Sequence, residues 1–172
     1  MNLRAQSGDA RHERKVADIP GLAPAAAFEG FIAASADTQQ WVGKETILLA
    51  EDEAFVRKAT SEALESAGYR VVVAGSAAQA LEAHRSCGEQ VDLLLSDLVM
   101  PGISGHELAT ELLVLCPNVR VLLMSGYAEQ LALCQLSSYG RQYLAKPFSI
   151  PVLLKRVREV LDADLLNWRA PV

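Results

Sequence analysis

The stretch LLLSDLVMPGISG, residues 93–105, joins an apolar run to a turn through a single aspartate. The leucines at residues 93–95 favour a strand with both faces buried, whereas Pro101 and Gly102 favour a turn. Asp97 lies between them. A carboxylate in that place is either a turn or cap residue, or a group that the end of a strand holds out for chemistry. The sequence on both sides of the stretch decides between these interpretations.

Apolar runs of strand length recur from Thr46 onward, at residues 47–50, 71–74, 91–95, 119–124 and 143–145. Segments with a helical pattern separate or follow them, at residues 54–67, 77–87, 105–116, 128–136 and 151–161. Gly68, Gly88 and Pro117 end the first three helical segments. Pro151 lies in the first turn of the last one, where its missing N–H costs little. The chain therefore alternates between strand and helix.

Strands that are apolar throughout are expected where helices cover both faces of a parallel sheet. Right-handed crossovers restrict the topologies, and the order 2-1-3-4-5 is the common solution at this size. We therefore predict an α/β fold, a flavodoxin-like (βα)5 doubly wound parallel sheet, over residues 44–163. Residues 1–43, polar at first and then rich in Ala, Pro and Gly, are predicted to form a flexible N-terminal extension, and residues 164–172 a C-terminal tail.

The composition argues against several classes of function. A formal net charge of −5 disfavours a broad basic face for direct nucleic-acid binding. No stretch approaches the roughly 18 apolar residues of a membrane span. Asp18, Pro20 and Pro24 interrupt the segment that most resembles a secretion signal. Three cysteines without a CxxC pair indicate free thiols in a reducing compartment. We expect a cytoplasmic protein without membrane attachment.

Polar side chains follow all but one of the predicted strands. The first strand is followed by Glu51 and Asp52, the third by Asp97, the fourth by Ser125 and Gly126, and the fifth by Lys146. In a doubly wound sheet the carboxyl ends of the strands meet at one edge, where ligands bind. We therefore expect these carboxylates, the hydroxyl and the ammonium to converge.

Each residue type has a chemical use at such an edge. Clustered carboxylates repel one another unless a cation joins them, and hard oxygen ligands suit Mg²⁺. An aspartate on a metal can attack phosphorus and form an acyl phosphate. A lysine and Mg²⁺ would offset the charge of the transferring group, and Ser125 with the backbone N–H groups beside Gly126 could donate to its oxygens.

Taken singly, each of these residues has a plainer explanation. An acidic pair at a helix start complements the helix dipole, an Asp before a turn is commonly a cap, and a lysine before a proline is commonly solvated. Their joint occurrence at four strand ends favours a functional site.

The chain from about residue 44 to 161 resembles the receiver domain of bacterial two-component response regulators. Glu51 and Asp52 in ILLAEDE match the acidic pair that holds Mg²⁺, and Asp97 matches the phosphoacceptor. Ser125 in LLMSGY and Tyr143 match the switch hydroxyl and the switch aromatic residue. Lys146 in YLAKPF matches the lysine before a proline, and the resemblance implies a cis Lys146–Pro147 bond.

The resemblance also implies a mechanism. Asp97 would accept a phosphoryl group from a phosphohistidine on a histidine kinase or a histidine phosphotransfer protein. Glu51, Asp52, Asp97 and the Val99 main-chain carbonyl would hold Mg²⁺, with Mn²⁺ as an alternative. Ser125 would move toward the phosphate, beside the Gly126 backbone, and Tyr143 would rotate inward. Such a domain is not an enzyme, beyond catalysing its own phosphorylation and slow dephosphorylation.

The expected output is a protein contact through the face built from the predicted fourth helix, last strand and last helix, and a homodimer is compatible with this. GKETILLAEDE and LLMSGY resemble hybrid-kinase receivers more than transcription factors, so a stand-alone receiver or the terminal receiver of a hybrid kinase is expected.

The sequence departs from the usual receiver pattern at a few positions. Glu51 replaces the commoner Asp, Ser125 replaces Thr, and residues 133–142 lack the usual Gly-Ala pattern. Two positions that tune dephosphorylation hold Val99 and Tyr127. Neither could orient an attacking water, which predicts a long-lived phosphoaspartate.

Two other classes remain as alternatives. A Mg²⁺-dependent phosphatase of the haloacid-dehalogenase type also uses Asp, Ser or Thr, and Lys, but places its nucleophile on the first strand with a second Asp two positions later, where this chain has Val99. A receiver-shaped interaction module that is never phosphorylated is the other.

Overall fold

The structure is a computed structural model, and it describes residues 41–87, 90–126 and 143–163. Five strands form one parallel sheet in the order β2-β1-β3-β4-β5, which confirms the predicted topology. The strands are β1 (Thr46–Ala50), β2 (Arg70–Ala74), β3 (Leu93–Asp97), β4 (Arg120–Ser125) and β5 (Tyr143–Ala145). The described helices are α2 (Ala54–Ser66), α3 (Ala77–Cys87), α4 (Gly105–Leu115) and α6 (Ile150–Asp162). The helix predicted at 128–136 lies outside the described residues.

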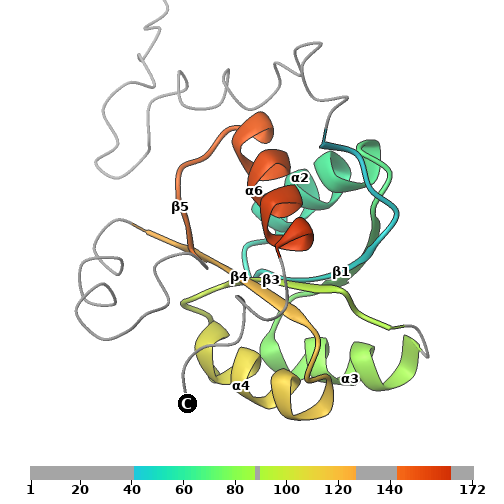
Figure 1. Cartoon of the computed structure of the whole chain (residues 1–172). Coiled ribbons are helices and arrows are strands. Elements are labelled where there is room, and N and C mark those ends of the chain that lie inside the picture. The colour runs from blue at the N-terminus through green and yellow to red at the C-terminus, as the bar shows by residue number, and fades with distance from the viewer. Residues whose placement is uncertain (1–40, 88–89, 127–142, 164–172) are drawn as a thin grey trace, which may run out of the picture.

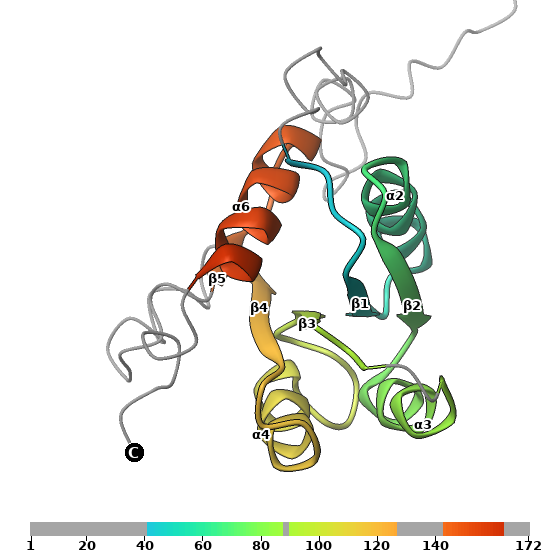
Figure 2. The same cartoon turned by 45° about the vertical axis from the view of Figure 1, so that its right-hand side comes forward.

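The helices cover both faces of the sheet, with α2 and α6 on one side and α3 and α4 on the other (Figures 1 and 2). Successive side chains of a strand point to opposite faces, so β1 contributes to two separate apolar layers. Ile47 and Leu49 pack with the α2 and α6 side chains, whereas Leu48 and Ala50 pack with α3 and α4. All four are fully buried, which explains why the strand is apolar throughout rather than alternating.

The boundaries of β3 differ from the prediction. The apolar pattern placed this strand at 91–95, whereas it spans Leu93–Asp97. The cause is pairing with the neighbouring strand, because β4 continues to Ser125 and its Met124 stands opposite Asp97. The hydrophobic pattern of a strand does not reveal how far it pairs with its neighbour. As a result Asp97 is the last residue of the strand and is paired with Met124 of β4.

Two helix starts show how local sequence sets the elements. Ser104 caps α4 in a reciprocal capping box: its Oγ accepts from Glu107 N at 3.3 Å, and Glu107 Oε2 accepts from Ser104 N at 2.9 Å. Pro151 lies in the first turn of α6 as predicted, but the side chain of the N-cap residue Ser149 makes no capping hydrogen bond.

The segment that enters β1 is tied to the domain. Trp41 packs against the core layer of α2 and α6, and its carbonyl accepts from Tyr69 Oη at 3.1 Å. Gly43 N donates to the Ala67 carbonyl at 3.1 Å. Glu45 forms an ion pair with Arg158 of α6 at 2.8 Å. These contacts fix residues on both sides of the domain boundary predicted between residues 43 and 44.

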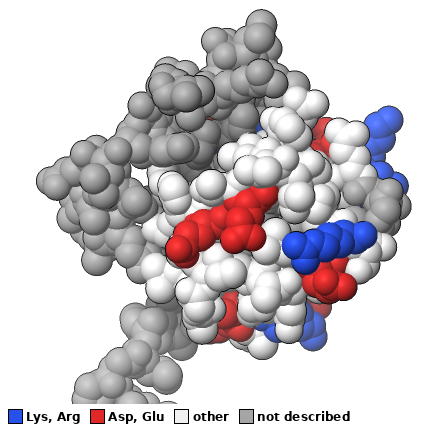
Figure 3. Space-filling model, turned by 90° about the horizontal axis from the view of Figure 1, so that it is seen from below, with Lys and Arg blue, Asp and Glu red and all other residues white. Residues whose placement is uncertain are grey.

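The face formed by α3 and α4 carries an acidic group and, across uncharged surface, a basic residue next to a further acidic one (Figure 3). On α3, Arg85 lies 4.0 Å from Glu82. On α4, Glu111 and Val114 are exposed. Among the described residues of this face there is no continuous basic band. Separately, none of the helices in the described ranges combines the length and apolarity that crossing a membrane requires.

Candidate functional site

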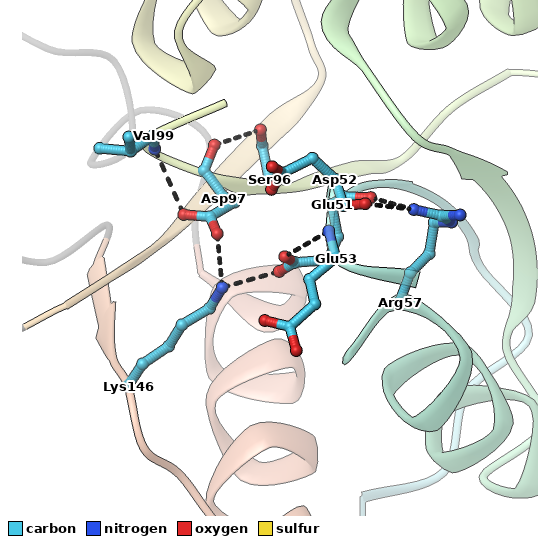
Figure 4. Close-up of polar contacts among 8 residues, drawn as sticks. All are labelled: Glu51, Asp52, Glu53, Arg57, Ser96, Asp97, Val99 and Lys146. Atoms are coloured by element: carbon cyan, nitrogen blue, oxygen red, sulfur yellow. Dashed lines mark hydrogen bonds and ion pairs between the residues drawn. The ribbon is translucent and has the colours of Figure 1, made fainter. Parts of the chain in front are cut away.

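Side chains from three strand ends meet at the carboxyl edge of the sheet (Figure 4). Glu51 follows β1, Asp97 ends β3 and Lys146 follows β5. The Lys146 ammonium lies between the two acids, with Nζ 2.7 Å from Glu51 Oε2 and 2.5 Å from Asp97 Oδ2. These residues are separated by up to 95 positions in the chain. The predicted convergence of the three side chains is therefore observed.

Asp52 completes an acidic cluster with Glu51 and Asp97. One carboxylate oxygen from each of the three residues lies within 4.8 Å of the others. The three differ in environment, since Glu51 is buried, Asp97 is half-buried and Asp52 is exposed. Asp52 is thus the most accessible of the three acids to solvent.

Burial and ion pairing act against each other in this cluster. The Glu51 side chain is only 1% exposed, and this burial raises its pKa, although the hydrogen bond from Lys146 opposes the shift. For Lys146, burial alone would lower the pKa, but the hydrogen bonds to Asp97 and Glu51 outweigh it and raise the pKa. The ion pairs therefore favour the charged form of Lys146, whereas burial disfavours the charged form of Glu51.

The donor set fits a hard divalent cation. When all are ionised, the three carboxylates and the single ammonium leave a net charge of −2. Lys146 contacts one oxygen of Glu51 and one of Asp97. Their second oxygens accept only longer hydrogen bonds, from Glu53 N at 3.4 Å and from Val99 N at 3.3 Å, and the Asp52 carboxylate is exposed. Oxygen ligands of this kind suit Mg²⁺, which binds through few carboxylates and retains several waters. Glu51, Asp52 and Asp97 could hold such an ion.

The loop after Asp97 is held by main-chain hydrogen bonds. Leu98 N donates to the Met124 carbonyl at 2.8 Å, and Val99 N donates to Asp97 Oδ1 at 3.3 Å. The Val99 side chain is 57% exposed. The predicted role of the Val99 carbonyl as a metal ligand stays a prediction.

Gly105 supports Asp97 from behind, a contact that the sequence reasoning missed. Its N–H donates to the Leu98 carbonyl at 2.9 Å. A Cβ at this position would overlap the Asp97 carbonyl oxygen and lie 2.8 Å from Ser96 Oγ. Only glycine lets the first turn of α4 approach the end of β3 this closely. The two glycines of the GISG sequence indicated a close backbone contact, but the sequence did not identify the Asp97 carbonyl as the partner.

Ser125 and Gly126 lie beside Lys146 at the end of β4. The Ser125 carbonyl accepts from Lys146 N at 2.8 Å, which fixes the two residues side by side. Ser125 is fully buried, and its Oγ has no hydrogen-bond partner among the described residues. Gly126 follows directly and is half-buried. A buried hydroxyl without a partner is a donor available for a ligand oxygen.

Tyr143 begins β5 opposite Leu123, and its ring packs against the core layer of α3 and α4. Its hydroxyl oxygen is inaccessible to solvent. The Lys146–Pro147 bond is cis, which confirms the prediction. Tyr127, the second residue expected to tune dephosphorylation, lies outside the described residues.

Arg57, in the first turn of α2, is a part of the site that sequence reasoning missed. Its Nη1 donates to the main-chain carbonyl of Glu51 at 2.6 Å and to that of Asp52 at 3.1 Å (Figure 4). The only signal in the sequence was a cation in the first turn of a helix, which is unfavourable with respect to the helix dipole, and this signal does not identify a partner.

These features are those of a phosphoacceptor domain in two-component signalling, and the comparisons agree. The family model described as "Response regulator receiver domain" matches residues 47–158. The chain belongs to this family.

Relatives come from both kinds of two-component protein. The chain is 38% identical over 141 residues to the sensor kinase CckA of Brucella abortus, an alignment that covers 81% of this chain but 15% of that kinase. It is 37% identical over 119 residues to the response regulator receiver protein CpdR of the same organism, covering 68% of this chain and 97% of that protein. The chain thus spans nearly all of the second relative and a small part of the first.

A solved structure shares the fold at similar identity. The response regulator TrrA of Thermotoga maritima, solved in complex with Mg²⁺–BeF, superimposes with a TM-score of 0.58 at 30% identity. The superposition covers 67% of this chain and 98% of that one. The chain is therefore a receiver domain of two-component phosphorelay signalling.

Proposed function

We propose that Asp97 accepts a phosphoryl group in a Mg²⁺-dependent reaction and that the phosphorylated domain signals through protein contacts. The observation that supports this most directly is the Lys146 ammonium between Glu51 and Asp97, with Asp52 beside them. This arrangement supports the proposal, because the Asp97 carboxylate lies next to a positive charge and to the carboxylates of Glu51 and Asp52.

The donor is a phosphohistidine on a histidine kinase or a histidine phosphotransfer protein. A carboxylate oxygen of Asp97 attacks phosphorus, the P–N bond to the imidazole breaks, and its electron pair returns to the imidazole nitrogen. Lys146 holds the acceptor carboxylate in place and offsets the charge of the transferring group. The domain is therefore a phosphoacceptor that catalyses its own modification rather than an enzyme acting on other molecules.

Glu51, Asp52 and Asp97 are the side chains that would hold Mg²⁺, with the Val99 carbonyl as a further ligand and Mn²⁺ as an alternative ion. When bound, the ion supplies positive charge that stabilises the phosphoryl oxygens. The TrrA structure in complex with Mg²⁺–BeF supports this assignment by similarity.

Ser125, Gly126 and Tyr143 form the proposed switch. The buried Ser125 hydroxyl and the Gly126 backbone donate to phosphoryl oxygens, and Tyr143 changes its packing as Ser125 moves. The support is twofold: Ser125 Oγ is buried without a hydrogen-bond partner among the described residues, and the Ser125 main chain is hydrogen-bonded to Lys146. A few charge-assisted hydrogen bonds suffice to bias a two-state element of this kind.

For the whole chain we propose a receiver domain at residues 44–163, with residues 1–43 as an extension and 164–172 as a tail, acting in the cytoplasm. The contacts of Trp41 and Gly43 with the domain argue for including residues from 41 onward in any expressed receiver. The proposed output surface contains β5 and α6, where Val152 is half-exposed. Dimerisation through this face is one form that the output could take.

Acetyl phosphate with Mg²⁺ tests the proposal. The intact mass should increase by one phosphoryl group, and Asp97→Asn should abolish the increase. Glu53→Gln, which removes an exposed acid beside the cluster, is the matched control and should leave the reaction unchanged. Beryllofluoride with Mg²⁺ should alter the environment of Tyr143. A wild-type chain that responds to neither reagent would instead be a passive interaction module, and turnover of a phosphomonoester that depends on Asp97 would indicate a phosphatase.

The lifetime of the phosphoaspartate is a separate proposal. The exposed apolar side chain of Val99 cannot orient a water molecule for attack on the acyl phosphate. We expect the modification to persist for minutes or longer after the donor is removed. A time course showing loss within seconds would refute this.

A further inference from the structure

Arg57 makes an unusual set of contacts for an arginine near carboxylates. Its hydrogen bonds to the described residues go to main-chain carbonyls, because one guanidinium nitrogen donates to both Glu51 O and Asp52 O. Among the described residues it forms no ion pair, whereas the adjacent Lys58 pairs with Glu62 along the exposed side of α2 at 3.8 Å. Arg57 is thus directed at the backbone of the acidic loop, on the opposite side from the Lys146 ammonium (Figure 4).

The loop that Arg57 contacts has few other restraints. Glu51 N donates to the Ala74 carbonyl at 3.1 Å, and Glu53 N reaches Glu51 Oε1 at 3.4 Å. The Asp52 carboxylate is exposed and accepts no hydrogen bond from the described residues. Its position relative to the other acids therefore depends on the main chain that carries it, and Arg57 restrains that main chain.

The neighbouring strand end leaves room for the guanidinium. A Cβ at Gly75 would lie 3.3 Å from Arg57 Nη1 and 3.2 Å from Gln79 Oε1. Gln79 Oε1 in turn accepts from Gly75 N at 2.8 Å. The end of β2 thus forms a wall beside Arg57, which limits the positions that the side chain can take.

We propose that Arg57 is a positioning residue for the divalent-cation site. It fixes the main chain of Glu51 and Asp52 so that their carboxylates are arranged for the ion before it binds. This inference rests on the proposed function, because it assigns Arg57 a role in the same site. Arg57 touches neither the ion nor the phosphoryl group, and acts through the two acids.

Mg²⁺ binding by the full chain, measured by calorimetric titration, tests the inference. Removing a residue that orients metal ligands typically weakens affinity by about 10- to 100-fold, so Arg57→Met should weaken Mg²⁺ binding about tenfold or more. Lys58→Met removes the same charge one residue further along α2 and should change the affinity less than about twofold. Arg57→Lys keeps a charged donor and should lose less affinity than Arg57→Met.

A kinetic measurement separates positioning from general damage to the fold. The Mg²⁺ concentration for half-maximal phosphorylation by acetyl phosphate should rise with Arg57→Met by the same factor as the dissociation constant. The rate at saturating Mg²⁺ should stay within about threefold of wild type, since the bound ion then holds the loop. Urea unfolding without metal identifies any variant that fails to fold.

Three outcomes would overturn the inference. If the Arg57→Met variant binds Mg²⁺ as tightly as wild type, the proposed role of Arg57 is overturned but the proposed function is not. A rate that stays low at saturating Mg²⁺ would assign Arg57 a different role. A wild-type chain that binds no Mg²⁺ would overturn both this inference and the proposed function.

Discussion

Replacing Lys146 by methionine should destabilise the metal-free domain in a pH-dependent way. The ammonium lies between Glu51, which is 1% exposed, and Asp97, which is 14% exposed. Methionine keeps most of the apolar stem but leaves two neighbouring carboxylates without their shared cation. Breaking a buried ion pair on one side is strongly destabilising, because the remaining charge is uncompensated.

The size of the effect has an upper limit set by protonation. Glu51 can escape its unfavourable charge by taking up a proton, and from an ordinary pKa of 4.5 this costs about 3.4 kcal/mol at pH 7. At pH 5 the same step costs only about 0.7 kcal/mol. We therefore expect Lys146→Met to lose about 2–3 kcal/mol of unfolding free energy at pH 7 and less than about 1 kcal/mol at pH 5.

Urea unfolding of wild type and variant at both pH values measures this difference. Lys58→Met is the control, because the Lys58–Glu62 pair is exposed on both sides and should contribute less than about 0.5 kcal/mol at either pH. Saturating Mg²⁺ at pH 7 should narrow the gap between Lys146→Met and wild type, since the ion supplies the missing charge. An equal loss at pH 7 and pH 5, or no loss at either, would refute the electrostatic account of the cluster.

Three further predictions concern other parts of the molecule. Asp52→Asn removes one of three like charges, so it should raise the urea midpoint of the metal-free protein. The same change removes a proposed ligand and should weaken Mg²⁺ binding by more than about tenfold, measured by calorimetric titration beside the unfolding experiment. The hydrogen bond from Arg158 holds the pKa of Glu45 in the folded protein below its ordinary 4.5. The unfolded chain therefore takes up a proton at Glu45 more readily than the folded one. The contribution of the ionised Glu45 to stability is present above pH 4.5 and is lost as the pH falls through the lower pKa of the folded state. The difference in urea midpoint between wild type and Glu45→Gln should accordingly be constant near pH 7 and shrink below about pH 4. Leu112→Ala, on the buried side of α4, should lower the unfolding free energy by about 2–5 kcal/mol. Val114→Ala on the same helix, where the side chain is 78% exposed, should change the unfolding free energy by less than about 0.5 kcal/mol, measured by thermal or urea unfolding.

The sheet order could be predicted because it follows from local patterns. Runs such as residues 47–50 are buried on both faces, and that requirement leaves few topologies for five strand–helix units. Once the order is fixed, Glu51, Asp97 and Lys146 must lie at one edge, because each directly follows or ends a strand. The position of these side chains is thus a consequence of the fold rather than of any local motif.

Contacts that depend on side-chain length or on close approach could not be predicted in this way. The sequence does not say that the guanidinium of Arg57 turns back to two carbonyls, since the same residue could equally extend into solvent. Nor does it say which atom Gly105 must avoid, because the Asp97 carbonyl is brought there only by the packing of α4. The end of β3 was placed too early for a related reason, as strand ends are set by the partner strand.

The two cations at the site have different roles because they meet different atoms. Lys146 contacts carboxylate oxygens and lowers the charge that an incoming ion would meet, whereas Arg57 contacts carbonyl oxygens and leaves every carboxylate oxygen of Asp52 available. If Arg57 paired with the acids directly, the cluster would be more stable without metal but would bind a divalent cation less well. Directing the guanidinium to the backbone keeps the net charge of the acids and Lys146 at −2 while restricting their positions. The clustered acids thereby carry an electrostatic cost in the metal-free state, and relief of that cost would contribute to the affinity for the proposed ion.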